Sequence, residues 1–102
     1  MKLSQAIRIG AKDTSQSFDE LVDNEDFPTQ ACALGCAYLA TREHTLGSPY
    51  KYMESIFPQH DDRIMCPESR RNGKLFNIIV SLNDSYRWTR EEIACWLEGI
   101  GY

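Results

Sequence analysis

The most restrictive feature of this sequence is its C-terminal stretch, residues 87–102, which reads RWTREEIACWLEGIGY. Thr89 is followed three residues later by Glu92, which is the spacing of a capping box, where each side chain accepts a hydrogen bond from the backbone N–H of the other residue. Trp88 and Ile93 stand at the two positions that form a hydrophobic staple across such a cap. The stretch therefore predicts a helix that begins directly after Thr89.

The predicted C-terminal helix carries an apolar stripe that must be covered. The stripe consists of Ile93, Trp96, Leu97 and Ile100. Gly99 is the expected stop of the helix. An isolated helix of this length is marginal in water, so we expect the stripe to pack on the preceding helix in an αα-hairpin closed by residues 83–88. The alternative is that part of the stripe, above all Trp96, is a partner-binding face.

Four earlier segments show helical periodicity or helix-start signals. They are residues 3–10 with Ser4 as N-cap, residues 29–44, residues 49–57 after the start signal Ser48–Pro49, and residues 75–82. The second segment is apolar on all sides and is the expected central helix, in which Gly35 allows another backbone to approach closely. The β-branched residues at 78–80 leave a short strand open as an alternative for the last segment. We expect the acidic residues 18–26 to form at most one helical turn on the surface.

These elements predict one fold class for the whole chain. A chain of 102 residues with 42% hydrophobic and 25% charged residues is expected to form one domain with an ordinary core. We therefore predict a single all-α domain over residues 1–102, built as a bundle of four or five helices that ends in the αα-hairpin.

Charge and hydropathy narrow the classes of function. The formal net charge of −4 argues against a chain whose main task is to neutralise phosphates. Charges at Lys2, Arg8 and Lys12 interrupt any apolar run long enough for the core of a signal peptide. No stretch approaches the roughly 18 consecutive apolar residues of a membrane span. We expect a cytoplasmic protein without membrane association, in which the four cysteines are reduced thiols.

Residues 58–73 form the longest segment without periodicity. Three arginines lie in this segment and a lysine follows it directly, which gives four basic residues. The four are Arg63, Arg70, Arg71 and Lys74. Loops of this length are usually functional or mobile, so an anion or an acidic partner could bind there. The alternative is a solvated loop in which Asp61, Asp62 and Glu68 offset the cations. We take the four basic residues, together with Trp96, as candidate partner-binding residues.

Cysteine and histidine residues offer a remote alternative, a metal or thiol site. The candidates are Cys32, Cys36, Cys66 and His60. Cys32 and Cys36 are one helical turn apart, but their spacing inside an apolar segment is not that of a zinc knuckle. The chain has no nucleophile elbow, phosphate-cradling glycine loop, dinucleotide fingerprint or H-E-x-x-H motif. We expect no enzyme and no cofactor.

A helix-turn-helix interpretation would make residues 89–99 a recognition helix for DNA. Three glutamates in that helix surround Arg90 and would repel phosphate, and the connector before it lacks the usual glycine. Binding of nucleic acid through the C-terminal hairpin is therefore an unfavoured alternative.

Three pieces of the sequence, MKLSQAIRIGA, CALGCAYLA and SLNDSYRWTREEIACWLE, resemble a group of short uncharacterised bacterial and phage-borne proteins. The resemblance implies that a signature hairpin is formed by Asn83, Asp84, Trp88, Thr89, Glu92 and Ile93, which have structural roles in turns, caps and core. It also implies a C-P-x-C motif where this chain has Cys66-Pro67-Glu68-Ser69, so one thiolate of a zinc or redox pair is missing.

The resemblance brings no established activity. We therefore expect a small non-catalytic accessory protein of a mobile element or prophage, acting on an unidentified protein partner or by self-association. The expectation follows from the lack of catalytic motifs and from the tryptophans and tyrosines of the chain, since aromatic residues are enriched in binding hot spots.

Overall fold

The computed structural model describes residues 1–42 and 47–102 of the chain. Its α-helices are α1 (Leu3–Ala11), α2 (Ala33–Thr41), α3 (Pro49–Ile56), α4 (Leu75–Asp84) and α5 (Arg90–Gly99). Its shorter elements are β1 (Ser15–Gln16), β2 (Gln30–Ala31), the 3₁₀ helix η1 (Pro58–Asp61), β3 (Arg63–Met65) and β4 (Asn72–Lys74). The predicted helices are present, but the all-α prediction is wrong in detail because the strands form two small sheets.

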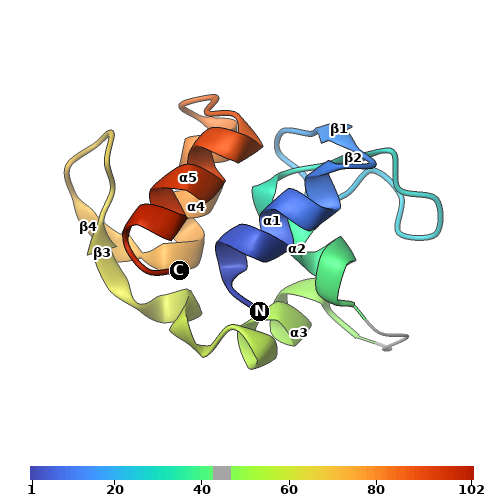
Figure 1. Ribbon diagram of the computed structural model, residues 1–102, viewed down its shortest axis with the longest axis horizontal. Coiled ribbons are helices and arrows are strands. Elements are labelled where there is room, and N and C mark those ends of the chain that lie inside the picture. The colour runs from blue at the N-terminus through green and yellow to red at the C-terminus, as the bar shows by residue number, and fades with distance from the viewer. Residues whose placement is uncertain (43–46) are drawn as a thin grey trace.

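The core lies where α1, α2, α4 and α5 come together (Figure 1). α1 makes its closest contact with α2, because Gly10 of α1 leaves room for the backbone of Cys36: a Cβ at Gly10 would lie 2.1 Å from the Cys36 carbonyl oxygen. A Cβ at Gly35 would lie 1.8 Å from the carbonyl oxygen of Leu21. The prediction that Gly35 allows a close backbone approach is therefore confirmed.

α5 begins with the predicted capping box. Thr89 Oγ1 accepts a hydrogen bond from the Glu92 N–H (3.1 Å), and Glu92 Oε1 accepts one from the Thr89 N–H (2.9 Å). Ile93 and Leu97 of the apolar stripe are fully buried. However, α5 packs chiefly on α1 and only slightly on α4, so the prediction that the preceding helix covers the stripe is wrong in its main partner.

Ion pairs join α5 to α1 on the solvent side of this contact. Arg8 pairs with Glu91 (3.1 Å) and with Glu98 (2.5 Å), and its hydrogen bonds to Glu98 and then to Cys95 raise the pKa of the guanidinium. Exposed ion pairs contribute little stability each. They make the facing surfaces of α1 and α5 complementary in charge.

Residues 58–84 combine a correct prediction with an incorrect one. The segment at 75–82, predicted as a helix with a short strand as the alternative, is the helix α4. The segment at 58–73, predicted to be an aperiodic loop, instead contains η1 and the antiparallel pair β3–β4. Strands of three residues are too short to show an alternation of polar and apolar side chains.

At the starts of α1 and α3, the observed caps differ from the predicted ones. The N-cap of α1 is Lys2, two residues before the predicted Ser4, and the Ser4 hydroxyl is buried without a hydrogen-bond partner in the described residues. The Lys2 N–H is bonded instead to the Gln5 side chain (3.0 Å). α3 begins at Pro49 as predicted, although Ser48 precedes it without a side-chain cap bond.

The central helix is shorter than the predicted 29–44. Gln30–Ala31 form β2, which pairs in parallel with β1, and Cys32 is the N-cap of α2. Residues 43–44 of that prediction lie outside the described residues. The acidic segment 18–26 contains no helical turn and is held by a bridge from Val22 to β2.

Candidate functional site

The β3–β4 hairpin stands at one end of the long axis of the molecule (Figure 1). Its register pairs Arg63 with Lys74, Ile64 with Gly73, and Met65 with Asn72. Side chains alternate between the two faces of a strand, so the first and third pairs share one face, and all four of these residues are exposed. The middle pair lies on the opposite, half-buried face. The hairpin thus offers one free face to solvent.

The four basic residues predicted as a binding cluster come together on this hairpin, with Arg63 and Lys74 on the strands and Arg70 and Arg71 in the turn. We call this set the basic cluster. No member of the basic cluster forms an ion pair within residues 1–42 and 47–102. Its charges are therefore available to a ligand.

The acids expected to offset the basic cluster are bound to aromatic residues instead. Glu68 Oε1 accepts a hydrogen bond from Trp88 Nε1 (2.8 Å), and Asp62 Oδ2 accepts one from the Tyr102 hydroxyl (2.6 Å). The bond to Asp62 also raises the pKa of Tyr102. Within the described residues, these two carboxylates form hydrogen bonds with aromatic residues and no ion pair with the basic cluster.

The turn of the hairpin is closed by its own backbone. The Cys66 N–H donates to the Arg71 carbonyl (2.9 Å), and the Arg70 N–H donates to the Cys66 carbonyl (3.0 Å). Arg70 has a φ of 63°, in the left-handed region that non-glycine residues rarely adopt. Burial disfavours the Cys66 thiolate, but hydrogen bonds from the Ser69 hydroxyl and from the N–H groups of Ser69 and Glu68 outweigh burial and lower the pKa of Cys66. The turn is thus a defined structure that holds two arginines at its tip.

Apolar surface accompanies these cations. Met65 is 51% exposed on the free face of the hairpin, and Tyr86 is 43% exposed on the connector after α4. A hollow of about 210 Å³ lies between β4 and α4, and Arg71 and Tyr86 are among its lining residues. Arginine, methionine and tyrosine are residue types enriched in protein–protein interfaces.

Trp96, the remaining candidate for partner binding, is half-buried against the core. Ile100, the last member of the same stripe, is 45% exposed. Trp96 therefore contributes mainly to the packing of the fold and only partly to the exposed surface.

Arg90 is turned inward, which weakens the recognition-helix hypothesis. Its guanidinium donates to the carbonyl and hydroxyl oxygens of Thr14 (2.6 and 2.8 Å) and to Cys36 Sγ (3.2 Å). Burial raises the pKa of Cys36 even though Arg90 acts to lower it. The basic residue that a recognition helix would present to phosphate is thus used to join α5 to α2 and to the segment that follows α1.

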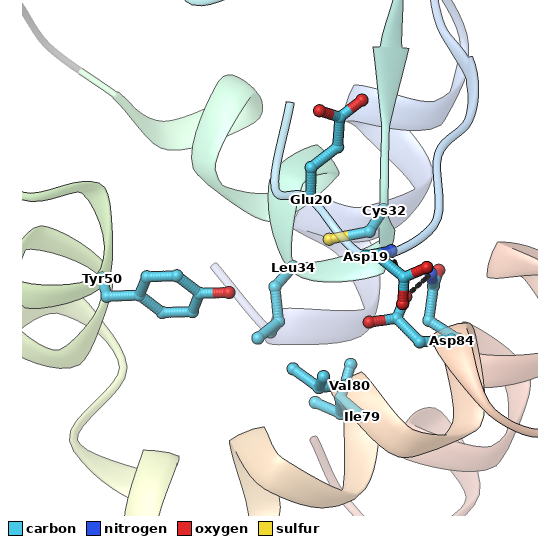
Figure 2. A pocket seen from close by; sticks show the side chains of 9 residues that line it. Asp19, Glu20, Cys32, Leu34, Tyr50, Ile79, Val80 and Asp84 are labelled. Carbon is cyan, nitrogen blue, oxygen red and sulfur yellow. Dashed lines mark hydrogen bonds between the residues drawn. The ribbon is translucent and has the colours of Figure 1, made fainter. Parts of the chain in front are cut away.

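A second cavity, of about 160 Å³, lies between the start of α2, the end of α4 and the turn around Asp19 (Figure 2). The Tyr50 hydroxyl points across it from α3 toward Cys32 and Asp84, while apolar side chains of α2 and α4 line the side shown below it. Asp84 Oδ1 accepts a hydrogen bond from the Asp19 N–H (3.1 Å). Sequence reasoning named Asp84 and Cys32 but missed Tyr50 and Asp19, which come from distant segments without a motif.

This cavity lacks an activated nucleophile. Burial, with a further contribution from Asp84, raises the pKa of Cys32 to about 11. Burial likewise raises the pKa of Tyr50, and the nearby Cys32 and Asp84 act in the same direction. Both groups hold their protons at neutral pH, and a thiol attacks as its thiolate.

The candidate metal ligands do not converge. Cys32 lines the cavity of Figure 2, Cys36 faces Arg90, and Cys66 lies in the hairpin turn. His60 lies on η1, where Nε2 is 3.4 Å from Glu54. In the described part of the chain, no three Cys, His, Asp or Glu side chains are grouped so as to hold a metal ion.

The signature residues implied by the resemblance lie at the junction of α4 and α5. Asn83 is fully buried at the end of α4, and Trp88 is half-buried before the cap. The roles of Thr89 and Glu92 in the cap are those described above. None of these residues contributes to the free face of the hairpin.

Comparison of the chain with protein-family models, with curated proteins and with solved structures finds no match. The resemblance to the phage-borne group therefore stays a prediction. Within the described residues, no helix is long and apolar enough to cross a membrane.

Proposed function

We propose that this chain is a small non-catalytic accessory protein that binds an acidic segment of another protein on the β3–β4 hairpin. The observation that carries the proposal is the basic cluster itself: four cations on a hairpin, without ion pairs in the described residues, on a chain with a net charge of −4. We also propose, from the free thiols of all four cysteines, that it works in a reducing compartment such as the cytoplasm. Its origin on a mobile element or prophage rests on the resemblance alone.

The surroundings of the basic cluster favour a protein over a nucleic acid as the partner. Glu68 stands in the same turn, and Met65 and Tyr86 add exposed apolar surface beside the cations. Surfaces that bind phosphate backbones are more uniformly basic. A partner with carboxylates and apolar side chains satisfies both parts of the surface.

Binding of a labelled acidic peptide tests this function. The probe is fluorescein-labelled acetyl-ETETETE-amide, titrated by fluorescence anisotropy at about 50 mM salt, where exposed charges are weakly screened. We expect saturable binding that weakens at higher salt. Arg71→Glu should weaken it about fivefold or more, because reversal of one charge removes an attraction of about 1 kcal/mol and adds a repulsion.

Lys51→Glu is the matched control. Lys51 is exposed on α3, outside the hairpin. Its replacement by glutamate changes the net charge by the same amount as Arg71→Glu, because both substitutions exchange a cation for an anion. It should change the affinity less than about twofold if the basic cluster is the site. Equal effects of the two variants, or tighter binding of a DNA duplex than of the peptide, would overturn the proposal.

A further inference from the structure

One edge of β3 has unpaired backbone groups. The hydrogen-bonded pairs that join the hairpin strands at either end are Asp62–Leu75 (2.9 Å) and Cys66–Arg71 (2.9 Å). Bonded and non-bonded pairs alternate along an antiparallel ladder. The N–H and C=O groups of Arg63 and Met65, which belong to the non-bonded pairs, therefore point away from β4. No hydrogen bond to them from outside the ladder is found in the described residues.

The two edges of the hairpin differ in their surroundings. Asn72 and Gly73 of β4 line the hollow against α4, and β4 continues directly into that helix. Arg63 and Met65 of β3 are both exposed. In the described residues, β4 is the only element that packs extensively on β3, so an added strand has access to the β3 edge.

The charges along this edge determine which strand can pair with it. A second copy of the chain, pairing edge to edge, would place Arg63 and Lys74 of both copies on the same face of the joined sheet. Basic residues on an edge are a known protection against such self-pairing. An extended segment with carboxylates on alternate residues would instead place its negative charges on the face that carries Arg63 and Lys74.

We propose that the β3 edge binds an extended acidic segment of the partner protein as a third strand. This inference rests on the proposed function and adds the mode of binding to it. The backbone groups of Arg63 and Met65 supply hydrogen bonds, and the basic cluster selects the acidic sequence.

Amide hydrogen exchange with the same peptide separates this inference from the proposed function. We expect saturating acetyl-ETETETE-amide to slow exchange of the Arg63 and Met65 amides at least about tenfold, since each acquires a hydrogen-bond acceptor or is shielded by the added strand. The Ile64 amide, already paired with β4, should change much less. Peptide binding without protection of Arg63 and Met65 would overturn the inference and leave the proposed function intact. An absence of binding would overturn both.

A pair of variants at Met65 provides a second test. Met65→Pro removes the outward N–H without removing a hydrogen bond of the hairpin. Met65→Ala keeps the N–H and shortens the side chain. We expect the proline variant to bind the peptide at least about fivefold more weakly than the alanine variant, the effect of a net hydrogen bond worth about 1 kcal/mol. Equal affinities of two variants with native amide spectra would contradict strand addition.

Discussion

Asn83 shows how one side chain can join three segments of this fold. Its amide oxygen accepts hydrogen bonds from the Gln16 side chain (2.9 Å) and the Ala33 N–H (3.1 Å). Its amide nitrogen donates to the Ser17 carbonyl (2.9 Å) and to Asp84 (2.7 Å). The Asn83 amide is fully buried. Its hydrogen bonds stabilise the fold as a set, because a buried partner that loses its hydrogen bond keeps its desolvation cost.

Replacement of Asn83 by alanine tests this network. The change leaves the Ala33 N–H and the Ser17 carbonyl without their partners, so the free energy of unfolding should fall by about 3 kcal/mol. Urea denaturation at neutral pH measures the loss. Asn77→Ala, at an exposed position of the same helix, is the control and should change stability by less than about 0.5 kcal/mol. A loss below about 1 kcal/mol for the Asn83 variant would show that the network is not stabilising.

At the scale of elements, the contact between α1 and α2 depends on a missing side chain. The close approach at Gly10 leaves no space for a methyl group, whereas a Cβ at Gly99 of α5 would meet nothing within 4 Å. The same substitution should therefore have opposite effects in the two helices.

Gly10→Ala should lower the free energy of unfolding by about 3 kcal/mol or more, because the backbone of α2 must move to admit the methyl group. Gly99→Ala should leave stability unchanged or raise it by up to about 1 kcal/mol, since alanine favours the helix. Thermal or urea unfolding of both variants gives the comparison. Similar losses in the two variants would refute the proposed close packing.

The capping box of α5 predicts a pH dependence. Backbone and hydroxyl bonds from Thr89 lower the folded-state pKa of Glu92 below its ordinary value of 4.5. The resulting stabilisation is complete above the unfolded-state pKa and is lost as the pH falls through the lower folded-state value. Glu92→Gln should therefore be less stable than the native chain at pH 7, and the gap should close on acidification below pH 4.5. Urea midpoints recorded across this range would contradict the account if the gap stayed constant or widened.

The elements differ in how far sequence could predict them. α5 and its cap follow from signals within a few residues, Thr89 and Glu92, so the start was correctly predicted. Its docking on α1 brings it against Arg8 and other residues far away in sequence, and no local pattern identifies this contact. The hairpin was missed because its strands are short and because Arg70 occupies a left-handed turn position where a glycine would have signalled the turn.

At the scale of the whole molecule, charge is distributed unevenly. The chain is acidic overall, yet the basic cluster lies at one end of its longest dimension of 37 Å. Sequence reasoning identified these four residues because they are close in the chain. It could not determine that Glu68 and Asp62 bind Trp88 and Tyr102, because these contacts join residues far apart in the sequence. It also could not find the cavity of Figure 2, which tertiary folding assembles from separate segments.

The measurement that tests the central claim most directly is a map of backbone amide resonances of the intact chain, recorded with and without the acidic peptide. The account predicts that the largest shifts lie within residues 62–75 and around Tyr86, and that a basic peptide of the same length, acetyl-KTKTKTK-amide, does not produce them. Shifts centred on Tyr50 and Asp84, or along the exposed side of α5, would place the binding surface elsewhere and contradict it.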